Sequence, residues 1–256
     1  GSAQAEGDAK AAADARRQAR EDLVAAIEVA RRLGLGRERG VLLRNLAYVW
    51  HVYENQPTKA LHFYAESVEV LRGVPGAEEF PGVLFNAART QLDTGRYDEA
   101  LASLDELLAL EGIDADLRWR ALGQRAYVLW RQGSLEKAAA AYAVAVGATP
   151  DAASRRWFKV QAAELHMARH DHDRAARLLE DVLAEEPGNT AALVQRAHLR
   201  GLRGDEAGAR ADMAAAEARA DTPTARLLLA FQRIRLLRGR GHVVEALKHA
   251  RETLEV

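Results

Sequence analysis

A short segment recurs along the chain, and this recurrence constrains the fold more than any other feature. Each copy starts at a turn residue, continues through polar residues and has alanine five positions later, as in GRYDEALASL from Gly95 and GSLEKAAAAY from Gly133. Related copies are NQPTKALHFY from Asn55, HDHDRAARLL from His170, GDEAGARADM from Gly204 and GHVVEALKHA from Gly241. Successive copies lie 40, 38, 37, 34 and 37 residues apart. Self-similarity at this period is typical of a solenoid, in which each unit packs on its neighbours.

Each copy joins two segments of helical length. Apolar residues recur at helical spacing before the turn, as in VLLRNLAYVWHVY, and after it, as in YDEALASLDELLAL. Glycine at the turn permits the left-handed backbone in which many helices end, and the following alanine lets the second helix approach the first. Chain breakers then separate the pairs, at Pro81, Pro150, Pro187 and Pro223. The pattern predicts about thirteen helices, one at the N-terminus followed by six pairs.

These residues resemble the tetratricopeptide repeat family. The matching features are a small residue within the first helix of each unit, the turn Gly95-Arg-Tyr97, a large residue after the second-helix alanine, and proline near the unit's end. The small residues are Ala47, Ala88, Ala126, Ala163 and Ala197, and the large ones are Tyr64, Leu104, Tyr142, Leu179 and Met213. The resemblance covers about residues 38–256. It departs from the family at His170, at Ile234, and at 54–57, where the first unit has one extra residue.

The resemblance implies an all-α fold, a right-handed superhelix of about six helix pairs preceded by an N-terminal helix. We expect residues 1–7 to be a cloning remnant and a disordered start, and 8–36 to form a helix that could be half of a degenerate repeat. Residues 37–256 are expected to form one continuous domain. Its units are predicted at 37–77, 78–114, 115–151, 152–188, 189–222 and 223–256.

The family geometry places a concave groove on the first helices of the units, and this groove is the predicted binding site. Tyr, Trp and Arg dominate the energetics of protein interfaces, so we predict a non-catalytic scaffold for a protein or peptide segment with apolar anchors and some acidic character. The competing interpretation is that Tyr127 and Trp130 pack in the core. The predicted partner-binding residues are Arg44, Tyr48, His51, Phe85, Arg89, Tyr127, Trp130, Trp157, Glu164, Met167, His198, Phe231, Arg235 and Arg238.

Several other functions are disfavoured. The chain has no cysteine, and no nucleophile–base pair or glycine-rich phosphate loop is present, so we expect neither catalysis nor a cofactor. The family's carboxylate clamp uses Lys and Asn where this chain has Arg44 and Tyr48. His166 and His170 could share a metal ion at helical spacing, but the intervening glutamate of a metalloprotease helix is missing. The longest nearly apolar run, 138–148, is too short to span a bilayer.

Charge and the C-terminal sequence leave alternatives open. Residues 54–116 carry thirteen acids and four bases, whereas 222–241 carry five arginines and no acid. The basic end could contact the acidic stretch of a second copy, and a nucleic acid is disfavoured by the net charge of −1. An apolar stripe (Val243, Val244, Leu247, Leu254) has no polar cap, which leaves open a homodimer or a longer protein.

The second functional hypothesis follows from that uncapped end: a regulatory or sensor segment of a larger signalling or transcription protein. The expected location is the cytoplasm, or the periplasm if a signal peptide has been removed. The richness in alanine and arginine is typical of a bacterium with high genomic GC content.

Overall fold

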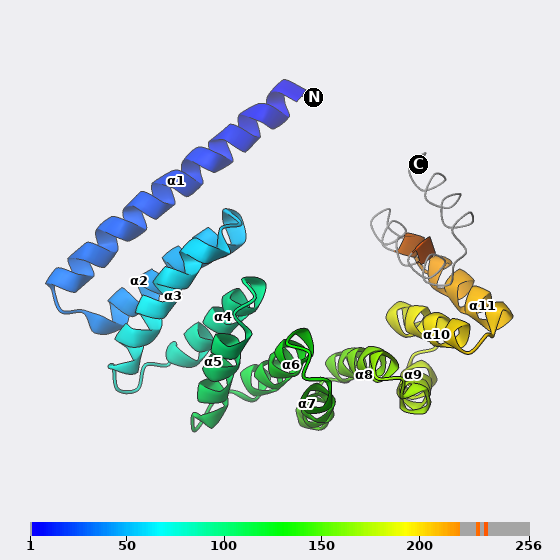
Figure 1. Cartoon of the computed structure of the whole chain (residues 1–256). Helices are drawn as coiled ribbons and strands as arrows, with labels where there is room; N and C mark the ends of the chain where they lie inside the picture. The colour runs from blue at the N-terminus through cyan, green and yellow to red at the C-terminus, as the bar shows by residue number, and fades with distance from the viewer. Residues whose placement is uncertain (1, 221–228, 231–232, 235–256) are drawn as a thin grey trace. The chain divides into compact units, whose positions relative to one another are not determined.

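The computed structural model describes residues 2–220, 229–230 and 233–234 (Figure 1). All regular structure in these residues is helical, which confirms the all-α class. The helices are α1 (Ser2–Arg32), α2 (Gly36–Tyr48), the π-helix η1 (Val49–Tyr53), α3 (Pro57–Arg72), α4 (Phe80–Asp93), α5 (Tyr97–Ala109), α6 (Ala115–Arg131), α7 (Leu135–Ala148), α8 (Ala152–Ala168), α9 (His172–Glu185), α10 (Thr190–Leu202) and α11 (Glu206–Glu217).

The chain folds into two compact units, Gly1–Ser134 and Leu135–Val256, here called unit 1 and unit 2. In unit 1 each helix from α1 to α6 packs on the next one along the chain. In unit 2 the same holds from α7 to α11. The first helices of successive pairs also touch, α4 with α6 and α8 with α10. This is the packing of a helical-repeat protein; that all the pairs form one continuous domain stays a prediction.

Small residues lie where paired helices approach most closely. The five alanines within the first helices (Ala47, Ala88, Ala126, Ala163 and Ala197) are all 0% exposed. The alanines after the turns, Ala100, Ala138, Ala175 and Ala209, are at most 3% exposed. The large residue that follows in each second helix fills the core beside them, and Tyr64, Leu104 and Leu179 are fully buried. The repeated sequence thus encodes the contact between the two helices of a pair within each unit.

The turn between paired helices has one backbone form in both units. Gly95, Gly133 and Gly204 have φ values of +75°, +86° and +81°. The next N–H group donates to a carbonyl five residues back, as from Arg96 to Gln91 at 2.8 Å, which satisfies an end group of the first helix. His170 takes the same turn at φ +59°, and Asp171 donates to His166 at 2.8 Å. The histidine therefore keeps the geometry of the glycine it replaces.

The extra residue of the first unit is accommodated earlier than predicted. The sequence placed it at 54–57, but the helix widens into the π-helix η1 at Val49–Tyr53. A π-turn absorbs one additional residue within a helix. Asn55 then turns the chain at φ +50°, and Pro57 opens α3. The N-terminal helix also ends earlier than expected, at Arg32, because Gly34 adopts a positive φ of +69°.

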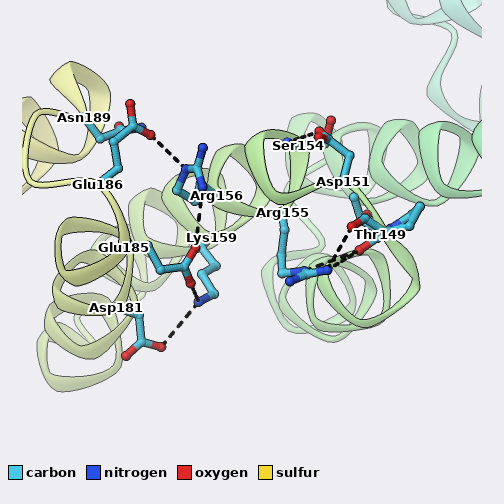
Figure 2. A network of polar contacts seen from close by, with 11 residues as sticks. Thr149, Asp151, Ser154, Arg155, Arg156, Lys159, Asp181, Glu185, Glu186 and Asn189 are labelled. Atoms are coloured by element: carbon cyan, nitrogen blue, oxygen red, sulfur yellow. Dashed lines mark hydrogen bonds and ion pairs between the residues drawn. The ribbon is translucent and has the colours of Figure 1, made fainter.

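Ionic contacts lock the pair α8–α9 in unit 2 (Figure 2). Asp151 caps α8 by accepting from the Ser154 N–H at 2.6 Å. Arg156 lies 2.8 Å from Glu186, and Lys159 lies 3.1 Å from Glu185. Since one partner of each pair comes from α8 and the other from the end of α9, these contacts fix how the two helices meet.

Candidate functional site on the first helices of unit 1

Three predicted groove residues of unit 1 surround one buried phenol. Tyr64, on α3, is 0% exposed, and its Oη has no hydrogen-bond partner among the described residues. Burial raises the pKa of Tyr64 to about 12, whereas Arg89 and Arg44 act to lower it and Tyr48 acts to raise it. These three side chains thus act electrostatically on the Tyr64 hydroxyl.

The two arginines of this cluster differ in how they are satisfied. The Arg44 guanidinium donates to the Asn45 Oδ1 at 3.0 Å. Arg89 is half-buried, and within the described chain it forms no hydrogen bond or ion pair. A guanidinium offers five N–H donors, and charge-assisted bonds to a carboxylate are the strong ones. Arg89 beside the unpaired Tyr64 hydroxyl is therefore a place where an acidic group of a ligand would be bound.

An exposed aromatic pair lies at the end of α2 and in η1. Tyr48 is 40% exposed and Tyr53 is 58% exposed, and their rings meet edge to face with centroids 5.8 Å apart. Val52 adds a further exposed apolar side chain. Tyr53 and Val52 were not among the predicted residues. The extra residue near Glu54 was the signal that could have found them, because π-turns recur at functional sites.

His51 connects η1 to α4. Its Nε2 lies 2.8 Å from the Asp93 Oδ2, and its Nδ1 lies 3.0 Å from the Thr90 Oγ1. The Thr90 hydroxyl also lies within hydrogen-bond distance, 2.9 Å, of the Asn86 carbonyl. With both ring nitrogens engaged, His51 holds the π-helix in place and leaves no ring nitrogen for a ligand.

The predicted aromatic residues of α6 lie partly on the surface and partly against the core. Tyr127 and Trp130 are half-buried and meet edge to face at 5.9 Å. The Arg131 Nη1 donates to the Tyr127 Oη at 3.2 Å, and Tyr127 packs against the apolar core of unit 1. Each of the two competing interpretations thus describes part of this pair.

Phe85 is a poor contact residue for a partner. It is 8% exposed, and the Arg120 guanidinium lies 4.9 Å from the centre of its ring. The side chain belongs to the core of unit 1 together with the other apolar residues of α4. The family resemblance implied a groove position for Phe85, but the Arg120 side chain of α6 lies over its ring.

In unit 2 the predicted residues do not form a comparable cluster within the described chain. Trp157 is 51% exposed and meets Phe158 edge to face at 5.1 Å. Glu164 accepts from the Gln195 Nε2 at 3.3 Å, and Met167, at 5% exposed, lies in the core. Of the remaining predicted residues, His198 is half-buried. Phe231, Arg235 and Arg238 lie outside the described residues, and so does the C-terminal apolar stripe of Val243, Val244, Leu247 and Leu254 that could form a homodimer.

The histidine-rich turn has a structural role. His166 is 8% exposed, burial lowers its pKa, and its Nδ1 lies 3.3 Å from the Asp171 Oδ2. The rings of His170 and His172 lie 6.1 Å apart. Over residues 2–220 and the four others described, no three metal-ligating side chains gather into a cation site. Among the same residues, no helix combines the length and apolar character needed to cross a bilayer.

Stacked helix pairs, buried alanines at fixed register and a left-handed turn in each pair define an α-solenoid repeat protein. Residues 85–153 match the tetratricopeptide repeat family. This stretch belongs to that family, and the resemblance noted in the sequence is confirmed. No curated protein has a matching sequence.

Solved structures with the same fold cover most of the chain. A tetratricopeptide repeat protein from Parabacteroides merdae is 17% identical with a TM-score of 0.65, and the match covers 93% of each chain. BtubC from P. vanneervenii is 18% identical with a TM-score of 0.65, covering 80% of this chain and 90% of its own. YrrB is 16% identical with a TM-score of 0.50, covering 73% and 89%. At these identities the similarity shows the fold alone.

The tetratricopeptide repeat fold is generally a scaffold for protein–protein interaction, and its members are typically non-catalytic. A fold hosts different functions through the sites it carries.

Proposed function

We propose that this protein is a non-catalytic scaffold that binds a segment of a partner protein on the first helices of unit 1. The proposal rests on one observation: the half-buried residue Arg89 forms no hydrogen bond or ion pair among the described residues and acts electrostatically on the buried Tyr64 hydroxyl, which also has no partner there. The Arg89 guanidinium therefore has N–H donors free for a carboxylate of a ligand.

The neighbouring side chains define the chemistry of the bound segment. Arg89 selects an acidic side chain or a terminal carboxylate. Tyr48 and Tyr53 offer an exposed aromatic edge of the kind that anchors apolar side chains at interfaces. The ligand we propose is thus a peptide segment with one acidic residue close to one apolar residue. YrrB, which has the same fold, is described as having an unusual peptide-binding site.

A selection of displayed peptides tests this proposal. A library of random dodecapeptides is enriched on the full chain, and the enriched peptides are titrated by fluorescence anisotropy against wild type, Arg89→Glu and Tyr48→Ala. A hydrogen bond to a charged group contributes about 1.5–3 kcal/mol, which corresponds to roughly 10- to 150-fold in affinity. We expect Arg89→Glu to weaken acidic peptides by at least this factor.

Arg118→Glu is the matched control. Arg118 is an exposed arginine of α6 in the same unit and has no described hydrogen-bond or ion-pair partner, so the two variants have the same net charge. Its affinity for the enriched peptides should stay within about twofold of wild type, since a rim charge contributes little. Equal losses in the two variants, or enriched peptides without acidic residues, would refute the proposed site.

A further inference from the structure

A second concave surface lies between the second helices of unit 1, α3 and α5. The groove has a volume of about 600 Å³, and α4 contributes Leu84 and Ala87 to its floor. Val68 and the Tyr64 ring add apolar surface from α3, and small exposed side chains, Ala65 and Ala102, lie on its two sides. Arg44, Tyr48 and Arg89 do not line it. Of the cluster described above, only Tyr64 also lines this groove.

Carboxylates outnumber basic groups around this groove. Its lining contains four glutamates and two arginines: Glu66, Glu69, Glu99, Glu106, Arg72 and Arg96. Arg72 is shared between two of these acids, lying 2.9 Å from Glu106 and in contact with Glu69. Arg96 lies 3.3 Å from Glu99, and Arg39 contacts Glu66, so each rim carboxylate already has one basic partner and a ligand would add a second. The surrounding stretch, 54–116, carries thirteen acids and four bases. A groove with an apolar floor and an acidic rim is complementary to a basic ligand.

The groove is long enough for a short extended segment. The lining of α3 runs from Leu61 to Arg72, about 16 Å along a helix at 1.5 Å per residue. An extended chain covers the same distance with about five residues.

We propose that the α3–α5 groove binds a basic, extended segment of a partner protein. In this arrangement Lys and Arg side chains lay their aliphatic stems over Leu84, Ala87 and Val68, as long basic side chains do on apolar surfaces. Their charged ends then reach the carboxylates at the rim, chiefly Glu69 and Glu99. These two acids are 73% and 54% exposed and so stay accessible to a ligand.

A peptide selection on the wild-type chain, followed by titration against a variant with a filled groove, tests this proposal. A library of random dodecapeptides is enriched on the wild-type chain, and each enriched peptide is titrated against Ala102→Trp, which fills the groove from an exposed position on α5 without changing charge. We expect a class of peptides with at least two more basic than acidic residues, whose affinity Ala102→Trp lowers by at least tenfold. Far-UV circular dichroism checks that the variant keeps wild-type helicity.

Charge variants then separate groove binding from general attraction to an acidic protein. Glu69→Gln/Glu99→Gln should weaken these basic peptides at least fivefold. Glu111→Gln/Asp116→Asn removes two exposed charges of the same unit outside the groove lining, and should change affinity less than twofold. Arg89→Glu should also leave these peptides within twofold, which distinguishes this groove from the acidic-peptide site.

The proposal fails if no enriched peptide responds to Ala102→Trp, or if the responding peptides are neutral or acidic. It fails equally if the control pair Glu111→Gln/Asp116→Asn weakens binding as much as the groove pair. Each of these results would stand whether or not the Arg89 site binds acidic peptides, because the two sites select ligands of opposite charge.

Discussion

Replacing His170 with glycine should stabilise the protein. His170 occupies the turn between α8 and α9, and the equivalent turns of the other described pairs from α4 onward have glycine. Its φ of +59° lies in the left-handed region, which disfavours a non-glycine residue by about 1–2 kcal/mol. Glycine also makes the unfolded chain more flexible, which lowers the free energy of unfolding by about 0.5–1 kcal/mol. The side chain is exposed, and its ring contact with His172 is at 6.1 Å, so little packing is lost. We expect His170→Gly to raise the free energy of unfolding by about 0.5–1 kcal/mol.

Urea unfolding followed by far-UV circular dichroism at neutral pH measures this change. The reciprocal substitution, Gly204→His, is the matched control, because Gly204 holds the same turn in the next pair at φ +81°. It should lower the free energy of unfolding by about 1 kcal/mol, since histidine must enter the left-handed region there. The slope of the transition should be unchanged in both variants.

One result would refute this reasoning directly. If His170→Gly leaves the stability unchanged or lowers it while Gly204→His is destabilising, the histidine side chain contributes an interaction that offsets its backbone strain. If neither substitution has an effect, the turn does not limit stability in unit 2.

Two further predictions concern buried polar groups of unit 2. Asp212 is 4% exposed and lies 2.7 Å from Arg196 and 2.9 Å from Arg200. Asp212→Ala should lower the free energy of unfolding, measured in urea, by about 2–3 kcal/mol because charge-assisted hydrogen bonds are lost. A loss below about 0.5 kcal/mol would contradict this prediction. Burial lowers the pKa of His166, so the unfolded chain takes up the proton first: stability should fall as pH drops below about 6.5, and His166→Gln should flatten that dependence. An unaltered pH profile in the variant would show that His166 does not cause it.

The repeat predicts the fold because packing within each helix pair uses fixed positions. Ala88 and Ala100 are fully buried where sequence spacing places them, and Gly95 takes the left-handed turn that its position demands. These relations are local, each within one pair. A single sequence therefore suffices to predict helices, turns and the close contact between them.

The surface was harder to predict because it depends on contacts between pairs. Phe85 falls at a groove position by spacing, yet Arg120 from the next pair lies over its ring. Met167 similarly enters the core of unit 2. The π-helix η1 ends at the exposed Tyr53, which meets Tyr48 edge to face, and the repeat pattern does not encode this local change of helix type.

Tyr64 shows how a packing position can also serve a surface. Leu104 and Leu179 occupy the equivalent place in later pairs and are equally buried, so a hydroxyl is not needed to fill this space. A buried hydroxyl without a partner destabilises a folded protein by about 1–3 kcal/mol. The ring of Tyr64 lines the α3–α5 groove, while Arg44 and Arg89 act on its phenol. Tyr142 holds the same position on α7 and is equally buried, so tyrosine recurs at this place as a packing residue.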